Sequence, residues 1–463
     1  MELPVTLIDD REAGSRPVWL VAGDGMNSAI AESHREWAAS CGFRGEAGKF
    51  LLVPGEGGGI AGALFGLGDA VERGGFAPLA TGALARLLPA GSWHLANPPK
   101  EAELATLGVM LGGYAFTRYG RKAGVEISFA APEGVDAARV RALAEGVFLT
   151  RDLINTPTND MGPSEIEQAA RDLAHRHGAA VDVIVGDDLL ERNFPMIHAV
   201  GRASSDAPRL IDLSWGREDA PKVTLVGKGV AFDTGGLDIK PPSNMLLMKK
   251  DMGGAANVLG LAAIVMALGL DLRLRVLIPA VENAIAGNAF RPGDVLASRK
   301  GLTVEIGNTD AEGRLILADA LAYADEDAPD LLIDMATLTG AARVALGPDL
   351  PPFFTDDDDL AAEIAGAAAR AADPLWRLPL WDGYDTRYSS RIADINNVNA
   401  DGFAGAIVAA LFLRRFVGQG RKWVHFDVFG WSPVERPHVT VGGEAQAIRA
   451  LADMLARRYK PRA

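Results

Sequence analysis

The sequence predicts a two-domain α/β protein, with a smaller N-terminal α/β domain and a larger C-terminal α/β domain whose mainly parallel central sheet is flanked by helices. The chain has 463 residues, which is more than a single hydrophobic core usually organises. Strand-like apolar runs alternate with helical stretches throughout its second half, and this alternation is typical of a parallel sheet covered by helices. A helical pattern that ends in Asn155-Thr-Pro-Thr-Asn159 separates the two halves.

Residues 1–135 form the predicted N-terminal domain, in which short apolar runs alternate with glycine-rich turns. The run 50–53 predicts a strand, and Gly55-Glu-Gly-Gly-Gly59 predicts the turn that follows it. Further along, residues 104–119 predict a helix and residues 125–131 predict a strand. Apolar residues then recur at helical spacing over residues 136–154. Together with the breaker, this helix forms a linker at residues 136–158.

Residues 159–463 form the predicted C-terminal domain. Its strand-like runs cover residues 209–215, 222–226, 274–278, 302–306, 331–335 and 423–428. Because sites in parallel sheets form beyond the carboxyl ends of the strands, we expect reactive side chains directly after these runs. The uncharged run 252–270 approaches the length of a membrane span. Its glycines, its Asn257 and the acidic residues at both ends instead favour a helix buried in an α/β core.

The composition excludes several classes of protein. Hydrophobic residues make up 48% and charged residues 23% of the chain, which is ordinary for a folded protein. The formal net charge of −14 argues against a surface that mainly binds nucleic acid or an anionic membrane. Cys41 is the single cysteine, so an internal disulfide is excluded. The first residues include Asp9 and Asp10 and no basic stretch, so we expect a cytoplasmic protein without a signal peptide.

Two segments that follow predicted strands concentrate charged side chains. Their carboxylates are Asp233, Asp251, Asp310 and Glu312, and Lys228, Lys240 and Arg314 lie among them. Four carboxylates in one cleft would repel one another strongly unless cations neutralised them, and two divalent ions would do so. Solvated loop acids with weak surface ion pairs are the alternative interpretation. Gly227-Lys-Gly229 matches neither a Walker A phosphate loop nor a dinucleotide fingerprint.

These segments resemble those of the leucyl aminopeptidase family of metallopeptidases. Asn308-Thr-Asp-Ala-Glu-Gly-Arg-Leu315 is similar to the family signature. A second stretch of the chain resembles the other metal-binding segment of the family, and the spacing of its residues matches. This stretch comprises Val226-Gly-Lys-Gly229, Phe232-Asp-Thr-Gly-Gly236, Lys240 and Met248 to Ala256. Further resemblances are Asn155-Thr-Pro157, Asp334-Met-Ala-Thr-Leu-Thr-Gly340 and Ile392-Ala-Asp394. The resemblance is dense over residues 150–430 and only architectural over residues 1–130.

The resemblance implies a site for two divalent metal ions per subunit, with Zn or Mn as the first candidates and Mg or Co as alternatives. Asp233 and Glu312 would bridge the two ions. Lys228 and Asp251 would complete the tighter site, and Asp310 would complete the more exchangeable one, partly through its backbone carbonyl. A lysine ligates only as the free amine, so Lys228 would lose its proton when a metal binds.

The same resemblance implies the catalytic groups and the substrate pocket. Lys240 would stay charged, polarise the scissile carbonyl and stabilise the oxyanion. Arg314 would hold a bicarbonate ion, the general base for a metal-bridging water whose pKa the metals lower. Met248 and Thr337 would line the pocket for the side chain of the first residue. The remaining substrate-binding positions are Asn308, Leu338 and Gly340.

The implied function is a metal-dependent aminopeptidase that hydrolyses the N-terminal peptide bond of peptides through this metal-bridging water or hydroxide and prefers apolar first residues such as Leu. Residues 159–463 would be its catalytic domain, and the chain would form a homohexamer. Two alternatives stay open. One is a DNA-binding or regulatory role, which the net charge disfavours. The other is a related dinuclear hydrolase specialised for dipeptides or Cys-Gly-type substrates.

Four positions bear on how closely the chain follows the family pattern. Asp238 places a negative charge two residues before Lys240, where the family more often has an uncharged residue. Phe429 and Trp431 add bulk that would narrow the pocket or a subunit contact. His425 is expected to be a packed structural histidine rather than a metal ligand.

Overall fold

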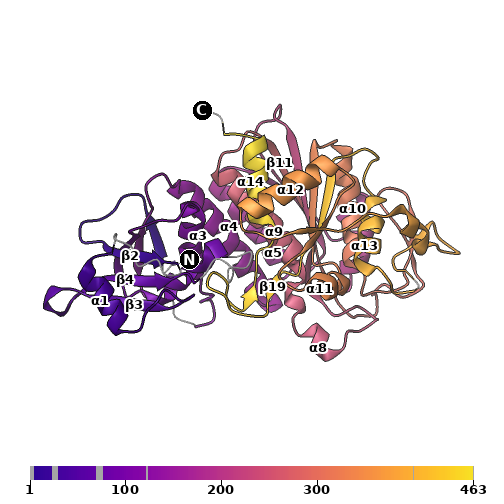
Figure 1. Ribbon diagram of the computed structural model, residues 1–463. Coiled ribbons are helices and arrows are strands. Elements are labelled where there is room, and N and C mark those ends of the chain that lie inside the picture. The colour runs from indigo at the N-terminus through magenta and orange to yellow at the C-terminus, as the bar shows by residue number, and fades with distance from the viewer. Residues whose placement is uncertain (1–4, 23–29, 69–76, 121–123, 400, 462–463) are drawn as a thin grey trace. The chain divides into compact units, whose positions relative to one another are not determined.

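The computed structural model describes residues 5–22, 30–68, 77–120, 124–399 and 401–461. The chain forms two compact α/β units (Figure 1). The first comprises Met1–Phe148 and Val434–Val441, and the second comprises Leu149–Pro433 and Gly442–Ala463. The helix expected over residues 136–154 is α4 (Ala137–Asn155), and the division between the units falls within it. The inclusion of residues 434–441 in the first unit was not expected from the sequence.

The first unit is built on a six-stranded sheet ordered β1-β6-β5-β2-β4-β3. Its strands are β1 (Val5–Ile8), β2 (Arg16–Val21), β3 (Phe50–Pro54), β4 (Ile60–Gly66), β5 (Gly91–Leu95) and β6 (Ile127–Ala130). The β3–β4 pair is antiparallel because the short glycine-rich turn predicted from the sequence connects the two strands. The other described pairs of this sheet are parallel.

The helices of the first unit are α1 (Glu32–Ser40), α2 (Leu84–Leu87) and α3 (Ala102–Gly112), followed by α4. The sequence predicted a longer helix over residues 104–119, but α3 ends at Gly112. Two consecutive glycines lie at this point, and glycine costs about 1 kcal/mol relative to alanine within a helix. The backbone of Gly112 also packs so closely on Gly82 that a side chain would not fit there.

The second unit is built on a nine-stranded sheet ordered β16-β15-β18-β14-β9-β11-β8-β7, with β10 paired to β11. Its strands are β7 (Ala180–Val185), β8 (Arg209–Trp215), β9 (Lys222–Gly227), β10 (Gly229–Asp233), β11 (Arg273–Asn283), β14 (Leu331–Ala336), β15 (Pro352–Phe354), β16 (Trp376–Arg377) and β18 (Trp423–Asp427). Strands β18, β14, β9 and β11 are parallel to one another. Strands β8, β7 and β15 run antiparallel to their inner neighbours. The predicted mainly parallel sheet is confirmed.

One predicted strand lies outside this sheet. Residues 302–306 contain β13 (Thr303–Glu305), which pairs with β12 (Val295–Ala297) and β17 (Ile395–Asn396). The strand is three residues long and pairs with β12 through a tight hairpin, so its pairing is local rather than part of the central sheet. A further small pair joins β19 (Trp431–Ser432) and β20 (Gly442–Gly443).

Helices flank the large sheet, with α9 packed on β9 and β14 and α10 packed on β9 and β11. The helices of this unit are α5 (Pro163–His177), α6 (Asp188–Glu191), α7 (Pro195–Gly201), α8 (Pro242–Met245), α9 (Gly253–Ala267), α10 (Gly313–Glu326), α11 (Gly340–Leu346), α12 (Asp358–Arg370), α13 (Gly405–Arg414) and α14 (Ile448–Arg458). The uncharged run 252–270 contains α9, which is almost wholly buried, as the sequence predicted. Among the described helices, none combines the length and apolarity needed to cross a bilayer.

Candidate metal centre

A cavity of about 440 Å³ lies where β9, β10 and β14 end. Lys228 follows β9, Asp233 ends β10 and Thr337 follows β14, so the reactive side chains lie beyond the carboxyl ends of strands. The predicted site residues that line the cavity are Lys228, Asp233, Lys240, Met248, Asp251, Asn308, Asp310, Arg314, Thr337, Leu338 and Gly340. Glu312 is not among the residues that line the cavity. It is buried at the start of α10, and its Oε1 lies 3.0 Å from Lys228 Nζ.

Two lysines lie between the carboxylates. Lys228 Nζ is 2.7 Å from Asp251 Oδ2 and 3.0 Å from Glu312 Oε1. Lys240 Nζ is 2.8 Å from Asp233 Oδ2 and also forms an ion pair with Asp310. The structure therefore brings together the acids of two segments that are separated by more than fifty residues of sequence.

Burial and like charges decide the electrostatics of this cluster. Burial raises the pKa of Glu312 to about 8, and the negative charge of Asp233 contributes to the rise. The same two causes raise the pKa of Asp310 to about 6. Burial by itself would lower the pKa of Lys228, but the carboxylates of Asp251, Glu312 and Asp233 outweigh it and raise that pKa. Positive charge beside these buried carboxylates would therefore stabilise their ionised forms.

The donor set fits divalent cations. Oxygens of Asp233, Asp310 and Glu312 lie within 4.8 Å of one another. Glu312 Oε2 is buried and has neither a hydrogen-bond donor nor an ion-pair partner within the part of the chain that the structure describes. A buried carboxylate oxygen without a partner is costly, and a divalent ion would supply the missing positive charge. Lys228 could join as a ligand after its ammonium loses a proton.

Side chains that the sequence reasoning did not assign hold the loops in place. Asn283, at the end of β11, donates from Nδ2 to Asp233 Oδ1 at 2.8 Å and to the Thr309 carbonyl at 3.1 Å. The Thr309 N–H in turn donates to Asp238 Oδ2 at 2.7 Å. The carboxylate of Asp238, noted above as a departure, thereby ties the loop after β10 to the signature loop. Asn397 Oδ1 accepts the Gly307 N–H at 2.8 Å on the other side of that loop.

The loop after β14 is anchored in a similar way. Thr337, predicted to line the substrate pocket, donates from Oγ1 to Asp251 Oδ1 at 2.9 Å. Asp427, at the end of β18, accepts the backbone N–H groups of Leu338 at 3.0 Å and Thr339 at 3.1 Å. Asp427 falls inside the run 423–428 that the sequence predicted as a strand, rather than directly after it, so the expectation of reactive side chains beyond strand ends did not single it out. The hydrogen bonds that Asp427 accepts indicate that it fixes the conformation of the loop after β14.

The aromatic and histidine positions noted in the sequence fall in different places. Phe429 lines the cavity, whereas Trp431 is not among its lining residues. His425 lies outside the cavity as well: it is buried within β18, and its Nδ1 is 2.6 Å from Asp334 Oδ1. His425 is therefore a packed structural residue, as the sequence predicted.

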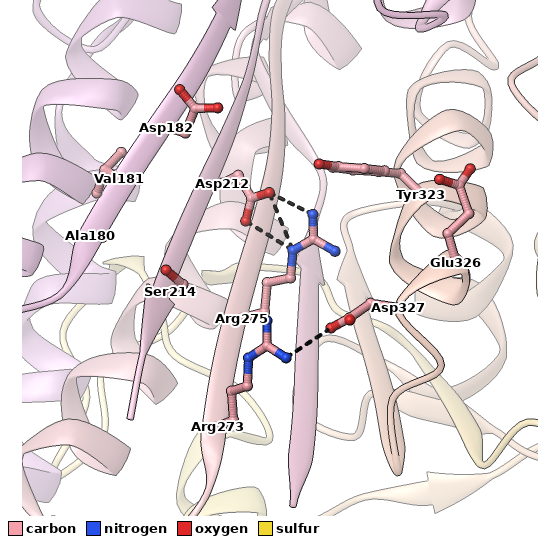
Figure 2. A pocket seen from close by; sticks show the side chains of 10 residues that line it. All are labelled: Ala180, Val181, Asp182, Asp212, Ser214, Arg273, Arg275, Tyr323, Glu326 and Asp327. Carbon is pink, nitrogen blue, oxygen red and sulfur yellow. Dashed lines mark hydrogen bonds and ion pairs between the residues drawn. The ribbon is translucent and has the colours of Figure 1, made fainter. Parts of the chain in front are cut away.

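A second cavity, of about 510 Å³, is lined by residues of β7, β8, β11 and α10 (Figure 2). None of the predicted site residues lines it. Figure 2 shows the guanidinium of Arg275 turned toward Asp212, with 2.6 Å between Nη2 and Oδ2, and Arg273 reaching toward Asp327 at 3.9 Å. Each of these two arginines is thus paired with a carboxylate that lines the same cavity.

Fold and site define an α/β protein of two domains with a buried carboxylate–lysine centre suited to divalent metals. A family model described as the cytosol aminopeptidase family, catalytic domain, matches residues 148–452. Another, described as the M17 aminopeptidase N-terminal domain, matches residues 17–132. The chain belongs to this family, which confirms the resemblance found in the sequence. Membership supports a hydrolase with metal-dependent aminopeptidase activity.

Individual relatives agree with this membership. A probable cytosol aminopeptidase of Roseiflexus castenholzii is 43% identical over 349 residues, which are 72% of this chain and 71% of the relative. A crystal structure of the cytosol aminopeptidase from Coxiella burnetii matches with a TM-score of 0.92 and 44% identity, covering 98% of this chain and 99% of that one. A bottromycin maturation enzyme in complex with Mn matches with a TM-score of 0.88 and 34% identity, covering 96% of this chain and 100% of that one.

Proposed function

We propose that the protein removes the first residue of peptides in a metal-dependent reaction and accepts apolar first residues such as Leu. The observation that carries the proposal is the buried cluster of Asp233, Asp310 and Glu312, in which Glu312 Oε2 lacks a partner among the described residues. Lys228 and Asp251 complete the proposed ligands of two divalent ions, with Zn or Mn as the first candidates and Mg or Co as alternatives. When bound, these ions would neutralise the carboxylates and turn a water into a strong nucleophile.

Lys240 stabilises the negative charge that develops on the scissile carbonyl oxygen in this proposal. Its Nζ lies 2.8 Å from Asp233 Oδ2, at the cavity edge of the cluster. Burial by itself would lower the pKa of Lys240, but Asp233 and Asp310 outweigh that effect and raise it, so the ammonium keeps its charge. A fixed cation in a site that excludes water stabilises an oxyanion strongly.

Arg314 provides the proposed site for a bicarbonate ion that serves as general base. Its Nη1 donates to the Asn397 carbonyl at 2.7 Å, which fixes the guanidinium at the cavity wall. Its Nε is buried and lacks an acceptor among the residues described. A buried donor without an acceptor on an arginine supports an anion at this point, since guanidinium groups bind planar anions well.

Met248 and Leu338 supply the apolar part of the pocket proposed for the first side chain, and Thr337, Asn308 and Gly340 complete the proposed contacts. An apolar pocket distinguishes side chains by only about 1–3 kcal/mol per methylene. We therefore expect a broad preference among apolar residues rather than strict selection of Leu.

The test is hydrolysis of aminoacyl p-nitroanilides by metal-stripped protein, with Zn, Mn, Co or Mg added back. We expect little activity without metal, recovery on addition, and a turnover about 10²–10³-fold lower in Lys240→Ala with its metals still bound. Lys422→Ala is the matched control, because this lysine is exposed and does not line the cavity. Normal turnover of Lys240→Ala would overturn the oxyanion role. An inactive metal-loaded wild type would overturn the function.

We further propose that the chain works in the cytoplasm as a homohexamer, as the family resemblance implies. Light scattering on the purified protein should then report about six times the 48.8 kDa mass of the chain. A mass of one or two chains would contradict this proposal.

A further inference from the structure

Phe429 forms part of the cavity wall beside the pocket proposed for the first residue. Its backbone N–H donates to Gln446 Oε1 at 2.8 Å, and that of Gly430 donates to the same oxygen at 3.0 Å. Gln446 is itself anchored, since its Nε2 donates to the Pro348 carbonyl at 2.7 Å. Gly430 packs on Thr337, where an added Cβ would lie 3.2 Å from the threonine methyl. Phe429 is therefore held in place at the border of this pocket.

Two cations lie over the ring of Phe429. Lys250 Nζ is 4.6 Å and Arg343 Cζ is 5.1 Å from the ring centroid, and all three residues line the cavity. Lys250 is buried, and Arg343 is exposed on α11. Within the described ranges of the chain, neither side chain has a carboxylate at ion-pair distance or a hydrogen-bond acceptor. The ring faces are a weak partner for a cation compared with a carboxylate.

The acids nearest to these cations are engaged elsewhere. Asp251 forms its ion pair with Lys228 at 2.7 Å. Asp427 accepts two backbone N–H groups and a hydroxyl from the loop after β14. Lys250 and Arg343 also repel each other. Two like charges that face one cavity without a counter-ion favour an anion between them.

We propose that Arg343 and Lys250 bind the side-chain carboxylate of an acidic first residue, so that the enzyme removes N-terminal Glu and Asp as well as apolar residues. This inference rests on the proposed aminopeptidase function and adds a substrate class to it. Arg343 keeps its charge throughout the physiological pH range and offers a planar pair of donors to a carboxylate. In this arrangement the ring of Phe429 packs on the methylenes of the substrate's acidic side chain.

The test compares kcat/KM for the p-nitroanilides of Glu and Gln, which have the same shape and differ in charge. We expect the metal-loaded wild type to prefer Glu about tenfold, as a charged hydrogen bond in a partly exposed site allows. Arg343→Gln should reduce this ratio by at least about fivefold. Arg343→Lys, which keeps the charge and loses the planar pair of donors, should reduce it less than Arg343→Gln does, and Lys250→Met should lower it as well. Arg391→Gln, which removes an exposed arginine outside the cavity lining, should leave the ratio unchanged.

Three outcomes would each contradict a different claim: the acidic specificity, the aminopeptidase function, or the part of the substrate that the two cations bind. A Glu/Gln ratio near one, in an enzyme that hydrolyses the Leu substrate with added metal, overturns this inference and leaves the proposed function intact. No hydrolysis of any substrate after metal addition overturns the proposed function instead. A third outcome is that Arg343→Gln slows hydrolysis of the dipeptide Leu-Gly but not of Leu-Gly amide, which lacks the C-terminal carboxylate, and leaves the Glu/Gln ratio unchanged. The cations would then bind the C-terminal carboxylate of a dipeptide, and our assignment to the first side chain would be wrong. Melting curves of every variant identify any that fails to fold.

Discussion

Replacement of Gly313 by alanine should destabilise the metal centre through a single methyl group. Gly313 is the first residue of α10, directly after Glu312, and its backbone conformation is open to any L-residue. A Cβ built there would lie 2.7 Å from Lys228 Nζ and 2.8 Å from Lys228 Cδ. Real Cβ atoms do not approach other heavy atoms so closely, so the lysine would have to move.

The expected magnitude follows from two opposing effects. Alanine in place of glycine favours a helix by up to about 1 kcal/mol. Overfilling a packed site costs about 1–3 kcal/mol, and shifting the Lys228 ammonium weakens hydrogen bonds to charged groups that are worth about 1.5–3 kcal/mol each. The clash therefore outweighs the helix propensity, and we expect the free energy of unfolding to fall by about 2 kcal/mol. Metal affinity should fall as well, because Lys228 would lie away from Asp251 and Glu312.

The assay is denaturant unfolding of the metal-free protein, together with calorimetric titration of Mn into each variant. Gly287→Ala is the control, because its Cβ meets nothing within 4 Å. In a Lys228→Ala background the clashing atoms are gone, so Gly313→Ala should there be neutral or stabilising. If Gly313→Ala is as stable as the wild type, or equally harmful in both backgrounds, the clash with Lys228 is not the reason for glycine at this position.

Three further predictions concern the second unit. Burial raises the pKa of Asp319 to about 7, so the folded chain keeps a proton that the unfolded chain releases above about pH 4. The wild type should lose stability relative to Asp319→Asn as the pH rises from about 4 to 7, and a constant difference in melting temperature would contradict this. Arg151 is fully buried and pairs with Glu444 at 3.0 Å. Arg151→Met should cost about 3–5 kcal/mol in unfolding free energy, and adding Glu444→Gln should recover much of it; equal unfolding free energies of the single and double variants would refute the pairing argument. Chelation of bound metal should lower the melting temperature. Mn at a hundred times its dissociation constant should then raise the free energy of unfolding by about 2.7 kcal/mol, and an unchanged melting curve would argue against a metal centre.

Much of the candidate site could be predicted from the sequence because its chemistry lies in short segments. Lys228 and Asp233 are five residues apart, and Asp310 and Glu312 two, on loops that follow strand-like runs. Local apolar periodicity also predicted α4, the buried α9 and the six strand-like runs of the second half. The predicted helix over residues 104–119 was too long, because periodicity does not weigh the glycines at which α3 ends.

The sequence by itself determined which residue types could hold metals and that a mainly parallel sheet would carry them. The tertiary structure alone decided what surrounds them. Asn283 reaches Asp233 across 50 residues, Asn397 reaches Gly307 across 90, and Leu338 reaches Asp427 across 89. Such contacts depend on the order of strands in the sheet, which no local pattern encodes. Lys250 and Arg343 both lie over the ring of Phe429 for the same reason, since three segments far apart in the sequence converge there.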